Sequence, residues 1–277
     1  MDEENNNVLN FEDALKALDT VSETFNVNVW IPSKKKEYTF KEIDAKQQKN
    51  MLSTAMNSSI YNTNFVKNLY SILNSNFLDK DCLGDLNKFT VFDKFSIAVA
   101  LKDKISDETS ITFDEKNNIV KKVSLKPIIE KFKTFQTPNN EIVEVDNQNI
   151  KIKLEISVPT IEKELQYEEQ LHKKEKKVDD IKDSDDIQRI VSEAFIGETT
   201  KYIKNIYINE SDLNFEKVDF IKKIKLVEKL PSGILQKILS IVSKWKAEID
   251  SVLTLSIVED GKTYTKVLNI DSVLFLN

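Results

Sequence analysis

Few side chains in this sequence have the types and spacing that catalysis or metal binding requires. The chain of 277 residues contains one cysteine, Cys82, and one histidine, His172. A single cysteine excludes an intramolecular disulfide and a thiolate-rich zinc site. Because no nucleophile and base stand at a recognisable spacing, Cys82 is interpreted as a small buried hydrophobic residue and His172 as a surface side chain. We therefore predict no catalytic residues, no cofactor and no metal ligands, and a protein that is not an enzyme.

Two pairs of adjacent aspartates, at 179–180 and 185–186, are the other candidates for acid–base chemistry or cation binding. They belong to a run of charged residues that supplies no apolar walls to shift a carboxyl pKa. This composition favours a solvated connection. With four glycines in the chain, a glycine-rich loop that binds phosphate cannot be assembled in the usual way, which disfavours a nucleotide enzyme.

Three consecutive lysines at 34–36 could contact phosphates, with the rings of Trp30 and Tyr38 nearby for base stacking. However, the net charge is −6 and Arg189 is the sole arginine, whereas contacts to nucleic acid are usually rich in arginine. Both aromatic residues occupy alternating strands, where a large ring usually belongs to the core. We interpret the lysines as a charged hairpin tip that discourages edge-to-edge sheet pairing, and we expect no nucleic-acid partner.

The lysines at 34–36 lie between two predicted strands, and helices flank this ribbon on both sides. Apolar residues recur at helical spacing over residues 11–25, which predicts a short N-terminal helix. Residues 27–32 and 37–43 predict the two strands. Asp44 is predicted to cap the helix that follows.

The middle of the chain is predicted to mix helices and hairpins. Helices are expected over residues 61–77 and 90–106, and the broad apolar surface of the second predicts a central position in the core. Residues 109–132 predict a hairpin that leads into a short helix, and residues 141–158 predict a second ribbon with period-two alternation. The segment from 159 onward is rich in charge, which indicates a solvated helix followed by a mobile connection.

The C-terminal part is predicted to be mainly helical and to end in a hairpin. Three helical segments are expected over residues 187–246, and the last begins after Pro231 with a continuous apolar stripe. Two alternating runs then flank Gly261, which can adopt the positive φ of a tight turn. This pattern predicts a terminal β-hairpin.

These elements predict an α+β fold of β-ribbons and small antiparallel sheets with amphipathic helices, and a helix-rich C-terminal part that ends in a β-hairpin. We divide the chain into an N-terminal helical extension (1–24), an α+β domain (25–158), a charged helix and linker (159–186) and a helical segment with the terminal hairpin (187–277). No apolar run approaches the roughly 20 residues that cross a bilayer. The polar N-terminus is unlike a secretory signal, so we expect a soluble, cytoplasmic protein without a membrane partner.

Four stretches follow one another in the order VNVWIPSKKKEYTFKEIDAKQQKNMLSTAM, TVFDKFSIAVALKDKIS, LVEKLPSGILQKILSIVSKW and LTLSIVEDGKTYTKVLNIDSVLFLN. In this order, over residues 25–277, they resemble the baseplate hub assembly proteins of T-even-like contractile-tailed phages. Asp93 and Lys102 match an aspartate and a basic residue of that family, which usually has arginine at the second position. Phe275 stands where two adjacent aromatic residues are common. Some relatives carry a cysteine-based metal knuckle in the last hairpin, which this sequence lacks, so no metal is carried over.

The resemblance implies a non-enzymatic structural or assembly protein of the baseplate hub, in the host cytoplasm during assembly and in the virion if it is retained. Its partners would be other hub or tail proteins, including the tape-measure protein. We expect the partner contacts at five residues of the first ribbon and the last hairpin, namely Trp30, Ile31, Pro32, Phe40 and Phe275. Two alternatives stay open: a transient tail-assembly chaperone that is absent from the mature virion, and a nucleic-acid-binding protein. The oligomeric state is left open as well.

Overall fold

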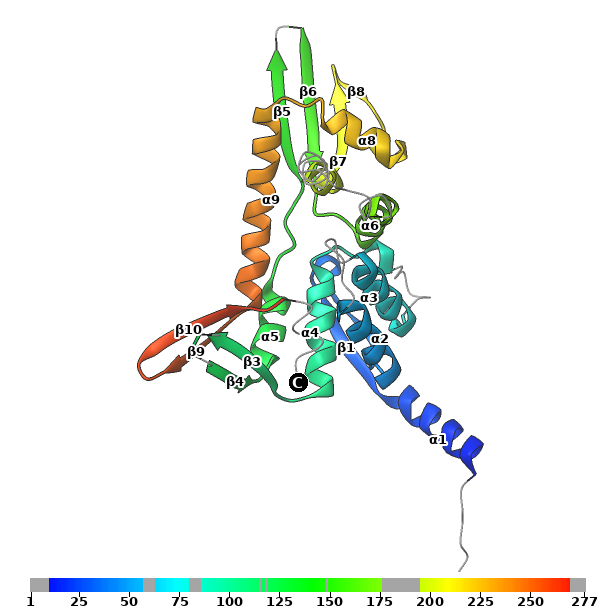
Figure 1. Ribbon diagram of the computed structural model, residues 1–277. Helices are drawn as coiled ribbons and strands as arrows, with labels where there is room; N and C mark the ends of the chain where they lie inside the picture. The colour runs from blue at the N-terminus through cyan, green and yellow to red at the C-terminus, as the bar shows by residue number, and fades with distance from the viewer. Residues whose placement is uncertain are drawn as a thin grey trace, which may run out of the picture.

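The computed structural model describes residues 10–56, 63–79, 86–114, 116–117, 119–147, 149–175 and 195–269. In this part of the chain, helices pack with small antiparallel sheets, and the last two strands form a hairpin (Figure 1). The predicted α+β class and the predicted C-terminal β-hairpin are therefore confirmed.

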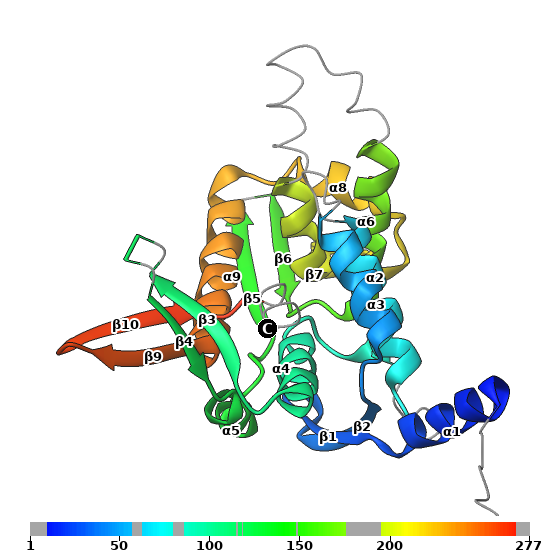
Figure 2. The ribbon, with the colours of Figure 1, turned by 60° about the horizontal axis from the view of Figure 1, so that its bottom comes forward.

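The N-terminal part follows the predicted order of helix, ribbon and two helices. Its elements are α1 (Phe11–Thr24), β1 (Asn26–Ile31), a 3₁₀ turn (Pro32–Lys34), β2 (Lys36–Lys41), α2 (Ala45–Met56) and α3 (Thr63–Asn76). β1 and β2 pair antiparallel, with Val27 opposite Phe40. α1 projects away from the other elements in both Figure 1 and Figure 2.

Asp44 caps α2 as predicted, and Gln47 completes a reciprocal capping box. The Gln47 backbone N–H donates to Asp44 Oδ1 at 2.7 Å, and the Asp44 N–H donates to Gln47 Oε1 at 3.1 Å. Backbone donors that a helix start leaves without partners are satisfied in this way. The Gln47 Nε2 group also donates to Asn76 Oδ1 at 2.8 Å, which joins the start of α2 to the end of α3.

α4 (Asp93–Ile105) lies at the centre of the molecule, and its residues from Ser96 to Lys102 are all buried. Ile97 and Leu101 on this helix belong to an apolar core shared with β1, β2, α2 and α3. Val99 belongs to a second core, which the middle and C-terminal elements build. A helix covered on all sides is expected to be apolar all round, and the predicted central position is confirmed.

Two hairpins enclose a short helix in the middle of the chain, as predicted. The elements are β3 (Thr109–Asp114), β4 (Ile119–Val123), α5 (Lys126–Thr134), β5 (Glu141–Asn147) and β6 (Ile150–Ile156). The apolar residues of β6 alternate, but their burial falls toward the tip. Leu154 and Ile156 are fully buried, whereas Ile150 is 48% exposed.

Two strands occur where the sequence predicts helix. After a helix over residues 195–202 come β7 (Ile203–Ile208) and β8 (Ser211–Asp212). β7 pairs antiparallel with β6, and the sheet has the order β5-β6-β7-β8. The described part of 187–246 does contain three α-helical segments, over residues 195–202, over Phe220–Val227 and from Ser232 onward, as predicted. The prediction missed the two strands, because pairing with a distant strand decides the conformation of residues 203–212.

The same sheet joins parts of the chain that the predicted boundary after residue 158 separates. One apolar core extends from Val91 to Leu268. Backbone hydrogen bonds also cross this region, from Val91 N–H to Pro159 O, from Ile161 N–H to Phe89 O and from Ser157 N–H to Tyr202 O. The division into an α+β domain and a separate C-terminal segment is therefore corrected, since both share one interior.

α6 (Ile161–Glu175) is not solvated on all sides, in contrast to the prediction from its charge. Ile161, Glu164 and Tyr167 are buried at the spacing of one helical face, and α6 packs against α3. The predicted mobile connection over residues 176–186 lies outside the described residues.

The C-terminal elements are α8 (Phe220–Val227), α9 (Ser232–Leu253), β9 (Thr254–Glu259) and β10 (Lys262–Val267). α9 begins directly after Pro231 and buries the predicted stripe, including Ile238 and Trp245. In the hairpin, Asp260 and Gly261 have φ of 50° and 72°, as in a type I′ turn. None of the helices in the described ranges is long and apolar enough to cross a membrane.

Candidate protein-interaction surfaces

Three of the five predicted partner-binding residues lie in the interior. Ile31 and Phe40 have no exposed surface, Pro32 is buried, and Trp30 is half-buried. The pairing register places Ile31 and Phe40 on the same face of the ribbon, and that face belongs to the core shared with α3 and α4. The prediction of an exposed contact at Ile31, Pro32 and Phe40 is therefore corrected, and Phe275 lies outside the described residues.

Asp93 holds the tip of this ribbon against the start of α4. Its carboxylate is fully buried and accepts hydrogen bonds from the Ser33 N–H at 3.0 Å, the Thr90 N–H at 2.7 Å and the Thr90 hydroxyl at 2.8 Å. Burial raises the pKa of the Asp93 carboxyl, and the hydrogen bonds from Ser33 and Thr90 oppose this effect. Lys102 is also buried, and desolvation lowers its pKa. Asp93 and Lys102, the two residues that match the family-like pattern of the second stretch, are thus both buried in the packed structure.

The three lysines form the exposed turn that the sequence predicts. Lys35 adopts the left-handed conformation with φ of 51°, which closes the turn between β1 and β2. Lys34 Nζ lies 5.8 Å from the centroid of the Phe89 ring, and Lys36 Nζ lies 5.3 Å from that of Tyr38. Two of the ammonium groups therefore rest near aromatic rings of the core edge, a contact worth about 0.5–1 kcal/mol at an exposed site.

Sequence reasoning missed a buried ionic cluster, which we name the Glu164 cluster and define by Tyr70, Lys94, Glu164 and Lys201. Lys94 Nζ donates to both carboxylate oxygens of Glu164, at 2.9 and 3.1 Å. Lys201 Nζ lies 3.6 Å from the same carboxylate, and the Tyr70 hydroxyl donates to it. The four side chains come from α3, α4, α6 and the helix of residues 195–202. The cluster therefore connects elements that are far apart in the sequence.

The protonation states in the Glu164 cluster follow from burial and charge. Burial alone would raise the pKa of Glu164, but the positive charges of Lys94 and Lys201 lower it to about 2. Burial and the nearby Glu164 carboxylate raise the pKa of Tyr70 well above its usual value. At neutral pH, Glu164 is therefore a carboxylate and Tyr70 a neutral donor. Since the carboxylate is held by two ammonium groups, the cluster is suited to stabilising the fold rather than to accepting a proton.

Further contacts surround Lys201, and Glu198 beside it reaches α9 through Lys246, whose Nζ lies 3.4 Å from Glu198 Oε1. Burial would lower the pKa of Lys201, but Glu164 and Glu198 raise it above its usual value. Glu198 Oε2 lies 2.6 Å from Lys201 Nζ, and the ring centroid of Tyr167 lies 5.2 Å from the same nitrogen.

The sequence does carry one signal for this site. Ile161, Glu164 and Tyr167 stand at helical spacing, which marks one face of α6.

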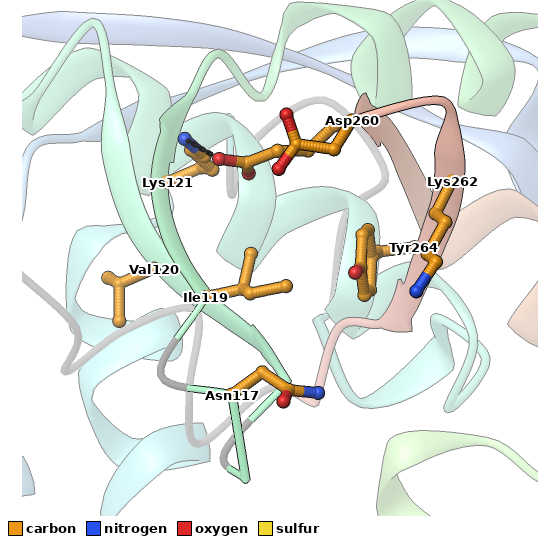
Figure 3. Close-up of a pocket in the computed structure, with 8 residues that line it drawn as sticks. Asn117, Ile119, Val120, Lys121, Asp260, Lys262 and Tyr264 are labelled. Carbon is orange, nitrogen blue, oxygen red and sulfur yellow. Dashed lines mark ion pairs between the residues drawn. The ribbon is translucent and has the colours of Figure 1, made fainter.

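An open groove of about 400 Å³ lies between the β3–β4 hairpin and the β9–β10 hairpin (Figure 3). It is lined by Asn117, Ile119, Val120, Lys121, Glu259, Asp260, Lys262 and Tyr264. Lys121 Nζ lies 2.9 Å from Glu259 Oε1, which joins the two hairpins at the wall of the groove. The mixture of charged and apolar side chains around an open hollow fits a polypeptide segment better than an enclosed small molecule.

Large apolar side chains are most exposed on α1 and on the terminal hairpin. Among the large apolar residues that the structure describes, the highest exposed fractions are 77% for Phe11, 74% for Val258 and 64% for Leu18. Leu15 completes the stripe on α1 and is also exposed. Contiguous exposed apolar groups of this kind mark sites of protein contact.

Several residues that the sequence analysis considers for catalysis or metal binding fall outside the described part of the chain. Cys82, the aspartate pairs at 179–180 and 185–186 and the side chain of His172 lie outside the described residues. Within the described ranges, no group of three or more His, Cys, Asp or Glu side chains is arranged to hold a metal ion. Comparison with protein-family models, curated proteins and solved structures gives no match.

Proposed function

We propose that this chain is a non-enzymatic structural or assembly protein of the baseplate hub of a contractile-tailed phage, and that it acts through contacts with other hub and tail proteins. It would act in the host cytoplasm during assembly and, if retained, in the virion. The order of the four family-like stretches along the chain supports this assignment.

The observation that carries the proposal is the exposed apolar stripe on α1, the helix that projects from the body. Phe11, Leu15 and Leu18 stand at positions i, i+4 and i+7, the spacing with which a helix fills an apolar groove of a partner. A second contact surface is the outer face of the terminal hairpin. Val258 and Thr263 lie opposite each other there, and both are exposed.

The proposal is tested by co-expressing the chain with the hub and tail proteins of the phage that encodes it. We expect a complex with at least one of them, and we expect Val258→Asp or Leu18→Asp to weaken it. Ser240→Asp is the matched control, because it adds the same charge at an exposed position on α9, away from both surfaces. If no hub or tail protein binds the wild-type chain, the proposed function is wrong.

Mass spectrometry of purified virions then separates the two protein-binding roles. A hub subunit is expected in the virion at a fixed ratio to other baseplate proteins. A chain that is required for tail assembly but missing from the virion would instead act as the transient chaperone. Both roles use apolar contacts, so the stripe on α1 fits either of them.

Retention of the chain on DNA, measured over a range of salt concentrations, tests the nucleic-acid alternative. A chain that engages several phosphates would lose its retention on DNA steeply as salt increases. We expect no retention at physiological salt. Steep, salt-sensitive retention that Lys34→Gln and Lys35→Gln abolish would favour the nucleic-acid alternative over the hub proposal.

A further inference from the structure

The acidic, apolar surface of α1 has a basic, apolar counterpart on α8. Within Phe11–Thr24 the sequence places four acidic residues and one lysine. Within Phe220–Val227 it places three lysines and no acidic residue. On α8, Ile221 is 52% exposed, and Lys222 and Lys225 beside it are exposed as well. By sequence, α1 therefore carries an excess of negative charge and α8 only positive charge, and both helices expose apolar side chains.

The outer face of α8 is available because the helix is anchored from its inner face. The ring of Phe220 packs against that of Tyr167, with centroids 5.9 Å apart. Lys223 is buried, and its Nζ donates to the Glu216 carbonyl at 3.2 Å. Asp219 caps the helix by accepting a hydrogen bond from the Ile221 N–H at 3.0 Å. These contacts fix α8 with its remaining lysines directed outward.

The two helices lie at opposite ends of the molecule in both views (Figures 1 and 2). α8 sits beside the four-stranded sheet, whereas α1 projects beyond the first ribbon. A contact between α1 and α8 therefore has to form between two copies of the chain. Pairing of α1 with α1 is disfavoured instead, because it would bring together two helices with a negative excess.

We propose that α1 of one copy docks on α8 of a second copy. The apolar stripe of Phe11, Leu15 and Leu18 covers Ile221, while acidic residues of α1 approach Lys222. Because the two surfaces differ, the contact is heterologous, and repetition of it yields a ring or an open filament. This self-contact goes beyond the proposed function, which concerns other phage proteins.

The first experiment measures the mass of the purified full-length chain by sedimentation velocity over a range of protein concentrations. We expect reversible self-association that weakens as salt is raised, because exposed charges are screened over about 8 Å at physiological ionic strength. A chain that stays monomeric throughout would overturn the proposal.

Charge reversal then identifies the basic surface. The double variant Lys222→Glu with Lys225→Glu is expected to weaken self-association by at least about tenfold, since attraction is replaced by repulsion. Lys46→Glu with Lys49→Glu is the matched control, because α2 also carries two exposed lysines near an exposed leucine, Leu52. An equal or larger effect of the control would assign the contact elsewhere and refute the role of α8.

Mixing two variants tests whether the contact is heterologous. Phe11→Ser with Leu18→Ser removes the stripe but leaves α8 intact, and the α8 charge reversal leaves the stripe intact. Each variant alone is expected to be monomeric, whereas the mixture is expected to form a one-to-one complex. Failure of the mixture to associate would rule out docking of α1 on α8. Unchanged far-UV circular dichroism of both variants excludes misfolding as the cause, since all four substituted side chains are exposed.

Discussion

Replacing Glu164 by glutamine is predicted to destabilise the protein strongly at neutral pH. The substitution keeps the shape of the side chain but leaves the ammonium groups of Lys94 and Lys201 buried without their shared carboxylate. The pKa of Glu164 is about 2 in the fold, against an ordinary value of 4.5. Since one pKa unit corresponds to about 1.4 kcal/mol, this difference represents about 3 kcal/mol of unfolding free energy at pH 7.

The effect has a defined pH dependence. A carboxyl group whose pKa is lowered by folding stabilises the fold above its unfolded-state pKa and loses this contribution as the pH falls toward its folded-state pKa. For Glu164, the loss occurs between pH 4.5 and about 2. Glutamine does not titrate, so the difference in unfolding free energy between the wild type and Glu164→Gln should stay constant above roughly pH 5.5 and fall by about half near pH 3.

Urea unfolding followed by tryptophan fluorescence, to which the buried Trp245 and the half-buried Trp30 both contribute, measures this difference at each pH. Glu169→Gln is the control, because Glu169 is exposed on the same helix and its replacement should change stability by less than about 0.5 kcal/mol. The reasoning is refuted if Glu164→Gln matches the control at pH 7. It is refuted equally if the loss of stability is the same at pH 3 as at pH 7.

Four further substitutions test the fold by the same urea unfolding. Gly261→Ala places a side chain at φ of 72° and should cost about 1 kcal/mol, whereas Gly233→Ala, which meets no atom within 4 Å, should cost nothing. Gly197→Ala brings a Cβ atom within 2.6 Å of the Tyr167 ring and should cost about 1–3 kcal/mol, and no loss would mean that the ring moves freely. Ile238→Ala should cost about 2–5 kcal/mol because the side chain is fully buried in α9, and a loss below 1 kcal/mol would contradict its place in the core.

The features that the sequence predicted correctly are those whose cause is local. Asp44 and Gln47 stand three residues apart, so the capping box depends only on their own backbone. The turn at Gly261 is predictable because both residues of a two-residue hairpin loop adopt positive φ, a conformation that glycine adopts without strain. The stripe of α9 repeats over 22 residues, which is long enough to define a helical face without knowledge of its partners.

The features that escaped prediction depend on distant partners. β7 has the sequence IKNIYI, whose β-branched and aromatic residues suit a strand, but its pairing partner β6 lies about fifty residues earlier. Glu164 belongs to a helix of low hydropathy, and nothing near it in sequence shows that Lys94 and Lys201 compensate its charge. Likewise Ile31 and Phe40 are apolar in the sequence whether they face a partner or the core, and only the packed structure distinguishes these cases.

α1 and α9 carry similar apolar stripes, and the comparison shows what an uncovered stripe implies. Burying a Phe or Leu side chain contributes about 1.5–3 kcal/mol, a stabilisation that α9 gains within the chain and α1 forgoes. A helix of 14 residues lies near the length at which isolated helices are marginal in water, so α1 becomes more stable when a partner covers its stripe. If α1 binds as proposed, we expect the contact to stabilise the helix, so that part of the contact energy is used for ordering. Such coupling lowers the affinity per area buried, which is compatible with the proposed role in assembly.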